Sequence, residues 1–453
     1  MTDSIDHNTA WAQRDLDHVW HPCTQMKDHE ALPPLPIRSA QGVWLEDFNG
    51  RRYIDAVSSW WVNLFGHSNP VITAALKDQL DTLDHIMLAG MTHTPAVELA
   101  ESLVRLAPEP LTRCFYADNG SAAVEAALKM SFHYWLNCGE TRPRFMSLSN
   151  SYHGETLGAL AVGDVPLYKS TYGPLLLDNI VVPGPDCYGR PEGMSWREHS
   201  EAAFAAMETA LEQHAAEVSA VIVEPLVQCA GSMRMYDPIY LTRLREACDR
   251  HNVHLIADEI AVGFGRTGTL FACEQAGIAP DFLCLSKGIT GGTLPLSVVL
   301  TSDDIYQAFY DDYAKMRAFL HSHSYTGNAL ACRAALATLS IFESRDVLTE
   351  VRAKGAAMEA AAAPLRDHPN VGDMRRHGMI MAIELVRDRD SLEPFDWRER
   401  RGRRIHRHAL TEGVLLRPLG DVVYFMPPFI INDDEIEAMV GAAIRGIELA
   451  VAG

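Results

Sequence analysis

A lysine ends a short apolar run in FLCLSKGITGG, residues 282–292. A hydrophobic run that is cut off by glycine is typical of a buried strand meeting its loop. At such an edge a lysine can lose part of its hydration, which lowers the pKa of its amine and lets it act as a nucleophile near neutral pH. Lys287 is therefore a candidate catalytic residue. A lysine whose ammonium reaches out to water explains the local pattern equally well.

A carboxylate holds a similar position in HLIADEI, residues 254–260, where Asp258 and Glu259 close another apolar run. Because open α/β sheets bind ligands at the carboxyl ends of their strands, Asp258 is a candidate ligand-binding residue. A helix cap or a surface position is the plainer interpretation. Residues 263–268, GFGRTG, have the glycine spacing of a dinucleotide fingerprint. They are weak evidence for a nucleotide, since they neither follow the strand directly nor precede a convincing phosphate-binding helix.

A turn that can hold an anion lies in FYADNGSAAVEAALKM, residues 115–130. The pattern predicts a strand, a turn and a helix, so that free backbone N–H groups and the helix dipole point at a ligand beside Gly120 and Ser121. Phosphate is the typical anion at such a position. An ordinary helix N-cap by Asn119 or Ser121 accounts for the same residues.

An aromatic residue and a histidine, Tyr152 and His153, lie in the segment NSYHGET after a further apolar run. In that loop a tyrosine ring can cover a flat ligand, or it can simply pack against the protein. An amine, a carboxylate, an anion site and an aromatic ring together match the needs of pyridoxal 5'-phosphate. This cofactor requires an amine to bind its aldehyde, a carboxylate at its pyridine nitrogen and an anchor for its phosphate. We therefore expect pyridoxal 5'-phosphate, carried by Lys287.

The strands and helices that would position these residues alternate along the middle of the chain. Helical patterns such as SAAVEAALKMSFHYWL separate several β-rich runs, which are TRCFYAD, RFMSLS, AVIVEPLV, HLIADEI, DFLCLS and LSVVLT. This alternation predicts an α/β fold with a mostly parallel sheet covered by helices. We expect a large cofactor-binding domain at residues 75–328 and a smaller α+β domain at residues 329–453. The N-terminal segment, residues 1–74, is expected to pack with the smaller domain.

The composition excludes several classes of partner. The chain has 453 residues, 47% of them apolar and 22% charged, which is typical of a globular enzyme. Its formal net charge of −20 argues against a nucleic acid or an anionic membrane as partner. The acidic start predicts no signal peptide, and no apolar stretch is long enough to predict a membrane span.

The cysteines and histidines predict neither disulfides nor a metal site. The nine cysteines are scattered and form no C-x-x-C pair, which favours reduced thiols and a cytoplasmic location. The pairs His321 with His323 and His251 with His254 lack further ligands at metal-binding spacing, so we expect no metal.

Over nearly its whole length the sequence resembles the class III (subgroup II) pyridoxal-phosphate aminotransferases of fold type I. The resemblance rests on ADNGSAAVEAALKM, SYHGET, IVEPLVQ, LIADEIAVGFGRTG, LSKGITGG and HSYTGN. It implies a large domain with a mostly parallel sheet of the seven-stranded type and a smaller α+β domain. It also implies that Lys287 carries the cofactor, Asp258 binds the pyridine nitrogen, Gly120 and Ser121 hold the phosphate, and Tyr152 lies against the ring, with Lys287, Asp258 and Tyr152 as the catalytic residues.

The same resemblance implies a homodimer with shared active sites. The segment HSYTGN, residues 323–328, would reach across the interface, so that His323 and Ser324 complete the phosphate site of the other subunit. Arg417 would pair with a substrate carboxylate, whose shape a guanidinium matches. The residues expected to bind substrate are Trp60, Tyr152, Lys287, Ser322, Arg417, Arg266 and Cys23.

Shorter motifs resemble one subfamily of biotin synthesis, which aminates 8-amino-7-oxononanoate with S-adenosylmethionine as donor. These motifs are WHPCTQMKDH, SSWWVNLFGH, MRMY and LLRPLGDVVYFMPP. Three departures leave the donor open: Cys23 stands where many members have an aromatic residue, Glu155 replaces the usual aspartate, and Ser322 takes a glycine position in a form similar to members that use lysine. Another ω-amino-acid aminotransferase remains an alternative. From other classes, a nucleotide-dependent oxidoreductase and a non-catalytic binding protein also remain.

Overall fold

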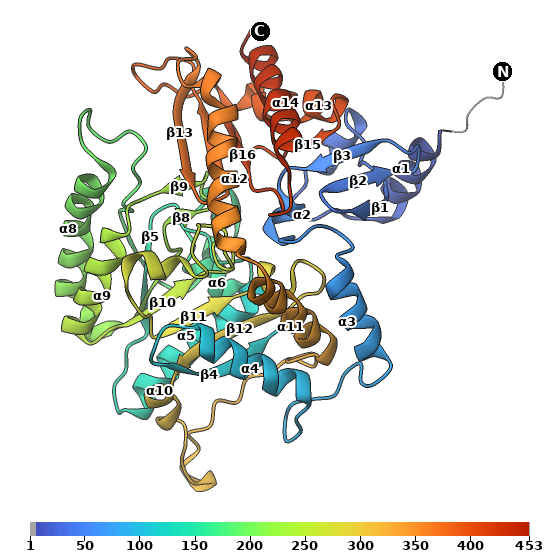
Figure 1. The fold of residues 1–453 in the computed structure, drawn as a ribbon. Helices are drawn as coiled ribbons and strands as arrows, with labels where there is room; N and C mark the ends of the chain where they lie inside the picture. The colour runs from blue at the N-terminus through green and yellow to red at the C-terminus, as the bar shows by residue number, and fades with distance from the viewer. Residues whose placement is uncertain (1–5, 453) are drawn as a thin grey trace.

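The computed structural model describes residues 6–452, in which a large α/β unit carries smaller sheets at one end (Figure 1). The large sheet has seven strands in the order β4 (Leu111–Ala117), β12 (Ser297–Ser302), β11 (Phe282–Leu285), β10 (His254–Asp258), β7 (Val218–Val223), β5 (Arg144–Leu148) and β6 (Ile180–Val182). Neighbours from β11 to β6 run parallel, whereas β12 runs antiparallel to β11 and β4. The mostly parallel sheet predicted from the sequence is confirmed.

Helices cover this sheet because its strands are apolar on both sides. Ile222 of β7 and Ile256 of β10 pack in one cluster with the alanines of α5 (Gly120–Asn137). Their neighbours Val221 and Leu255 belong to another cluster, with side chains of α8 (Trp196–His214) and α9 (Ile239–His251). Adjacent residues of a strand point to opposite faces, so a strand buried on both faces reads as a continuous apolar run.

The smaller sheets join distant parts of the chain. A four-stranded sheet contains β1 (Ile37–Gln41), β2 (Trp44–Asp47), β3 (Arg52–Asp55) and β15 (Val414–Leu415). A three-stranded sheet contains β13 (Val371–His377), β14 (Ile380–Leu385) and β16 (Val422–Phe425). The strands β8 (Val227–Gln228) and β9 (Arg234–Met235) form a hairpin. Because β15 pairs in parallel with β3, the N-terminal segment and the C-terminal part share one sheet.

The remaining helices flank these sheets. They are α1 (His7–His18), α2 (Ser58–Trp61), α3 (Pro70–Leu80), α4 (Thr94–Leu106), α6 (Leu157–Ala161), α7 (Pro166–Lys169), α10 (Asp303–Gln307), α11 (Ala329–Ser344), α12 (Val347–Ala361), α13 (Arg401–Thr411) and α14 (Asp433–Val451). The domain boundaries drawn from the sequence stay predictions. Residue 74 lies inside α3, and residue 328 caps α11.

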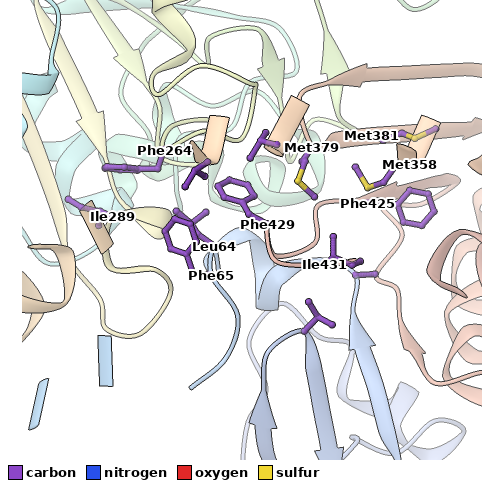
Figure 2. Packing of buried hydrophobic residues seen from close by; sticks show 14 of the residues in the cluster. Leu64, Phe65, Phe264, Ile289, Met358, Met379, Met381, Phe425, Phe429 and Ile431 are labelled. Atoms are coloured by element: carbon purple, nitrogen blue, oxygen red, sulfur yellow. The ribbon is translucent and has the colours of Figure 1, made fainter. Parts of the chain in front are cut away.

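The N-terminal segment, the large sheet and the C-terminal part meet in one hydrophobic cluster (Figure 2). Phe65 packs edge-on against Phe429 with ring centroids 5.9 Å apart. Leu64 and Ile289 belong to the same cluster, and a Cβ on Gly288 would lie 3.1 Å from the Leu64 side chain. Apolar contacts with the segment before α3 therefore fix the turn that contains residues 288 and 289.

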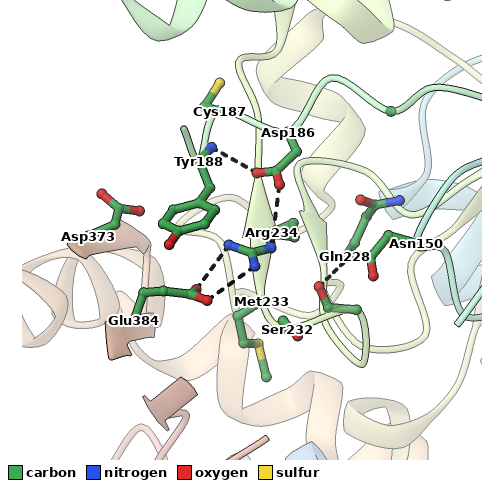
Figure 3. A network of polar contacts seen from close by, with 12 residues as sticks. Asn150, Asp186, Cys187, Tyr188, Gln228, Ser232, Met233, Arg234, Asp373 and Glu384 are labelled. Carbon is green, nitrogen blue, oxygen red and sulfur yellow. Dashed lines mark hydrogen bonds and ion pairs between the residues drawn. The ribbon is translucent and has the colours of Figure 1, made fainter. Parts of the chain in front are cut away.

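A polar network ties the large unit to the three-stranded sheet (Figure 3). Arg234 of β9 donates to Glu384 of β14 at 2.9 Å, and Arg375 of β13 donates to the same carboxylate at 2.7 Å. The side chain of Arg375 is only 1% exposed. Removing one partner of such a buried pair is strongly destabilising, so this network holds the hairpin of β8 and β9 against the C-terminal part.

Three further features bear on the sequence-based expectations. Within residues 6–452 no helix is both long and apolar enough to cross a membrane. All nine cysteines are free thiols. In the same part of the chain, no three His, Cys, Asp or Glu side chains gather as the ligands of a metal ion would.

Candidate active site

Lys287 and Asp258 lie at the same edge of the large sheet. Strands β10 and β11 are parallel neighbours, and Asp258 at the end of β10 is paired with Cys284 of β11. The chain reaches Lys287 just beyond the end of β11. This carboxyl edge is where open α/β sheets bind ligands. The strand order thus brings the predicted amine and the predicted carboxylate together.

The backbone gives Lys287 an unusual conformation. Its φ is +46°, in the left-handed region that residues other than glycine seldom adopt. Nζ lies 4.5 Å from the centroid of the Trp61 ring. Burial lowers the pKa of the Lys287 amine, while nearby acidic groups, including Cys229 and Asp258, act against this shift. A lowered pKa increases the share of neutral amine, which is the nucleophilic form.

Asp258 is paired with a histidine to which the sequence analysis assigned no role. Nδ1 of His153 lies 2.8 Å from Oδ2 of Asp258, and the side chains are 0% and 5% exposed. The other ring nitrogen of His153 is buried and has no hydrogen-bond partner within residues 6–452. The motif SYHGET offered a signal, because His153 follows Tyr152. However, the two residues are 105 positions apart in the sequence, so no local pattern reveals their contact.

Glu259, the neighbour of Asp258, has a structural position instead. Its buried carboxylate accepts hydrogen bonds from the backbone N–H groups of Ala272 at 2.6 Å and Cys273 at 2.7 Å. Burial raises the pKa of Glu259 to about 7. The glycines of GFGRTG are followed only by a short 3-10 turn at Ala272–Ala276. The phosphate-binding helix of a dinucleotide site is therefore absent at this place.

A second buried carboxylate, Glu224, comes directly after β7, which lies next to β10 in the sheet. Its Oε2 accepts from the backbone N–H of Tyr152 at 2.9 Å, and its Oε1 accepts from that of Cys229 at 3.0 Å. Burial raises the pKa of Glu224 to about 7. Glu224 thus anchors the loop that carries Tyr152 and His153 to the sheet edge.

The start of α5 is in close contact with the SYHGET loop. Asn119 caps the helix, and the first N–H groups, at Gly120 and Ser121, have no partner inside the helix. The backbone N–H of Glu155 donates to Oγ of Ser121 at 3.1 Å, and a Cβ on Gly154 would lie 2.1 Å from the same oxygen. Only glycine fits at position 154, where φ is +127°. The predicted anion site therefore borders the loop that carries Tyr152.

Two tyrosines form one wall of the site. The hydroxyl of Tyr152 donates to Glu155 at 3.1 Å, and its ring packs edge-on against Tyr168 with centroids 5.4 Å apart. Burial raises the pKa of Tyr152, so this hydroxyl stays protonated and can donate. Burial also raises the pKa of Tyr168 to about 12, and the thiol of Cys23 is close enough to contribute. The wall therefore includes Tyr168, which the sequence analysis missed, and Cys23 lies beside it, while substrate binding by Cys23 stays a prediction.

Trp60 and Arg417 lie together on another side. The Arg417 guanidinium carbon is 4.8 Å from the centroid of the Trp60 ring. Both residues are exposed, and Arg417 makes no ion pair with any residue from 6 to 452. Trp61 lies beside the Lys287 amine, so the two consecutive tryptophans lie between this amine and the free guanidinium of Arg417 along the site. Carboxylate binding by Arg417 stays a prediction that this geometry permits.

Arg266 is directed at the protein backbone. Its side chain is buried, and it donates to the main-chain oxygens of Pro427 and Asn63, each at 2.8 Å. The terminal nitrogens are thus occupied by the protein backbone. Substrate binding by Arg266 stays a prediction, and the observed contacts favour a structural role.

The segment around His323 lies on the surface of the single chain. Nδ1 of His323 is 2.9 Å from Asp118, and the main-chain oxygen of Ser324 accepts from His85 at 2.8 Å. Ser322, His323 and Ser324 are all exposed. His323 lies near the start of α5. Its contact with another subunit stays a prediction.

Comparison with known proteins shows the family. Residues 25–446 match the model of the aminotransferase class-III family. The adenosylmethionine-8-amino-7-oxononanoate aminotransferase of Helicobacter pylori is 47% identical over 441 residues, which cover 96% of this chain and 97% of the relative. The protein of that name from Geobacter sulfurreducens is 44% identical over 447 residues, covering 97% and 98%.

Solved structures agree. The adenosylmethionine-8-amino-7-oxononanoate aminotransferase of Methanocaldococcus jannaschii superposes with a TM-score of 0.92 at 37% identity, covering 97% of this chain and 99% of that one. An omega transaminase of Pseudomonas jessenii in complex with PMP also gives 0.92, at 28% identity and 97% and 98% coverage. With this family match over most of its length, the chain belongs to the class-III aminotransferases.

Proposed function

We propose that this chain is a pyridoxal-5'-phosphate-dependent transaminase of biotin synthesis, which transfers an amino group from S-adenosylmethionine to 8-amino-7-oxononanoate. The observation that carries the proposal is the meeting of Lys287 and Asp258 at one sheet edge. It occurs in a chain that is 47% identical, over nearly its whole length, to a relative named for this reaction.

The residues at the sheet edge fit the cofactor. Lys287 offers an amine with a lowered pKa, and Asp258 offers a carboxylate that His153 holds in place. The start of α5 and the Ser121 hydroxyl offer hydrogen-bond donors for a phosphate. A buried oxygen of Asp118 and a buried nitrogen of His153 have no hydrogen-bond partner within residues 6–452. Unpaired polar atoms of this kind are expected beside a ligand that completes them.

The proposed chemistry assigns a role to each of these side chains. When bound, pyridoxal phosphate supplies an aldehyde that links to amines and a protonated ring that takes up negative charge. Nζ of Lys287 is the base that removes a proton from the donor carbon and the acid that delivers one to the acceptor carbon. Asp258 stabilises the positive ring nitrogen, and His153 fixes the orientation of that carboxylate. Tyr152, whose backbone Glu224 holds, would cover the ring.

The substrates are proposed from the names of the relatives and from the free guanidinium of Arg417. An arginine without an ion-pair partner suits the carboxylate of 8-amino-7-oxononanoate. S-Adenosylmethionine is the proposed donor, as the relatives' names suggest. Lysine is the alternative donor, on the basis of the departures at Cys23, Glu155 and Ser322.

We further propose a homodimer in the cytoplasm. Large apolar side chains are exposed in two segments, residues 85–91 and 310–325, which the contact of His85 with Ser324 joins. They are Met87, Met91, Tyr310, Tyr313, Met316, Leu320 and Tyr325. Many exposed large apolar side chains in neighbouring segments favour a protein interface. The free cysteines support a reducing compartment.

The two half-reactions test the proposal. The cofactor-loaded enzyme is mixed with S-adenosylmethionine or with lysine, and the loss of its visible absorbance identifies the donor. The product formed from 8-amino-7-oxononanoate is then identified by mass spectrometry. The related omega transaminase structures make an ω-amino-acid transaminase the competing function. Much faster amination of pyruvate or succinic semialdehyde than of 8-amino-7-oxononanoate would favour that competitor.

A further inference from the structure

The two active-site tryptophans belong to a turn with an unusual backbone. The four residues of α2 have φ values of +49° at Ser58, +47° at Ser59, +71° at Trp60 and +74° at Trp61. Residues with a Cβ seldom adopt this left-handed conformation, and when they do it is mostly as single residues. Four in succession form one turn of left-handed helix. Such strain persists only where the surrounding structure holds it, and it concentrates at functional sites.

A buried carboxylate holds the first half of this turn. Asp55, at the end of β3, is 0% exposed. Its Oδ2 accepts from the hydroxyl of Ser59 at 2.7 Å and lies 2.9 Å from Nε2 of His67. The backbone N–H of Val57 lies 3.4 Å from the other oxygen. Asp55 thus joins the start of the left-handed turn to the segment at His67.

Arg266 and Tyr424 hold the other half. The guanidinium of Arg266 donates to the main-chain oxygens of Trp61 at 3.4 Å and Asn63 at 2.8 Å. The indole N–H of Trp61 donates to the hydroxyl of Tyr424 at 3.1 Å. A Cβ on Gly292 would lie 2.8 Å from the backbone of Asn63, so the turn also presses on the loop after Lys287. These contacts explain why Arg266 is buried and directed at main-chain oxygens.

The turn points its two rings at different parts of the site. Trp61 lies under the Lys287 amine, at 4.5 Å, and Trp60 lies against the Arg417 guanidinium, at 4.8 Å. On a right-handed turn or a strand, two consecutive side chains would point in other directions, because side-chain direction depends on φ and ψ. The left-handed turn therefore sets the spacing between the amine and the guanidinium.

We propose that Asp55 is a positioning residue, which holds residues 58–61 in a left-handed turn so that Trp60 orients Arg417 for the acceptor carboxylate and Trp61 borders Lys287. The part that concerns the acceptor rests on the proposed function. The strained turn itself does not.

The strain is tested by a pair of substitutions at Ser58. The Ser58 hydroxyl is buried and has no hydrogen-bond partner within residues 6–452, so its loss affects both variants equally. At ordinary positions glycine is less stable than alanine, but at a left-handed residue the order reverses. We expect thermal unfolding of the Ser58→Gly holoenzyme about 2 °C above that of Ser58→Ala. A lower unfolding midpoint for Ser58→Gly than for Ser58→Ala would refute the left-handed conformation of Ser58.

The positioning role is tested at Asp55 and Ser59. Ser59 is exposed, so Ser59→Ala removes its hydrogen bond to Asp55 without disturbing the core. We expect this variant to raise the KM for 8-amino-7-oxononanoate about five- to tenfold, within the range for the loss of one ordinary hydrogen bond, with a smaller change in kcat. Asp55→Ala should have a larger effect, and Asp55→Asn should recover part of it, because the amide oxygen still accepts from Ser59.

Binding of a carboxylate that does not react tests the positioning role independently of the proposed function. Binding of nonanoate is measured by calorimetry in the wild-type holoenzyme and in Ser59→Ala. We expect a weaker association in the variant even if 8-amino-7-oxononanoate proves not to be the acceptor. A KM and a nonanoate affinity that both stay within twofold of the wild type in Ser59→Ala would refute the positioning role, whether or not the Asp55 variants fold.

Discussion

Nδ1 of His153 lies 2.8 Å from Oδ2 of Asp258 in a pair that is almost completely buried. The histidine comes from the loop after β5, and the aspartate ends β10. Glu224 holds the same loop through the backbone N–H of Tyr152. The orientation of the Asp258 carboxylate is therefore set by a loop that a second carboxylate, Glu224, anchors.

We expect His153→Phe to lose activity about 10- to 100-fold, because Asp258 is then buried without its partner, a loss of about 1–3 kcal/mol. His153→Asn retains a side-chain donor and should recover part of the loss. The measurement is kcat together with the dissociation constant of pyridoxal phosphate. A fully active His153→Phe would show that Asp258 needs no such support.

Lys287→Ala should fold and keep affinity for the cofactor through Ser121 and Asp258. It should lose transamination by several orders of magnitude, because the same amine binds the cofactor and moves the proton. Turnover and absorbance spectra check this expectation. Lys77→Ala, an exposed lysine of α3, is the matched control and should behave as the wild type. Near-normal turnover in Lys287→Ala would remove the lysine from the mechanism.

Arg417→Ala should raise the apparent KM for 8-amino-7-oxononanoate about thirtyfold or more, since the bound acceptor would desolvate this exposed guanidinium and truncating one partner of a desolvated charge pair costs about 2–5 kcal/mol. The half-reaction with S-adenosylmethionine should change much less. Arg105→Ala removes an exposed arginine that pairs with Glu343 and serves as control. Equal effects on both half-reactions would place Arg417 outside the acceptor site.

The raised pKa of Glu224 predicts a pH dependence of stability. The pKa rises from 4.5 to about 7 on folding, so between these values the folded protein binds more protons than the unfolded one. Stability therefore falls as pH increases through this window and stays low above it. Relative to Glu224→Gln, which cannot ionise, the cofactor-free wild type should lose about 3 kcal/mol of unfolding free energy. Urea unfolding at several pH values measures the difference, and a constant difference would contradict the prediction.

The dimer prediction is checked by complementation. In the shared site predicted here, Lys287→Ala removes the residue of one subunit, and an inactive Ser324 variant removes that of the other. Mixing them equally should restore about a quarter of the wild-type activity, because half of the dimers are mixed and each has one intact site. Leu320→Glu should weaken the dimer in sedimentation, whereas Leu449→Glu on α14 should not. An active monomer at assay concentration would disprove the shared site.

The sequence by itself predicted the residues whose roles depend on local pattern. Apolar runs that stop at glycine or at a charged residue indicated where β10 and β11 end, and hence Asp258 and Lys287. The Asn-Gly-Ser turn before an alanine-rich pattern indicated the start of α5. Propensity, capping and burial act over a few residues, so these features can be interpreted without knowing the rest of the chain.

Tertiary structure decided which of these residues meet and what the remaining ones do. Two features depend on strand order, which no local pattern encodes. They are the antiparallel direction of β12 and the contact of His153 with Asp258, which lie 105 positions apart in the sequence. Asp258 and Glu259 look alike in sequence, yet one pairs with a histidine and the other with backbone N–H groups. Arg266 was predicted to bind substrate, but it donates to main-chain oxygens. Every residue except proline carries the same backbone donor and acceptor, so only folding determines which of them a buried charge contacts.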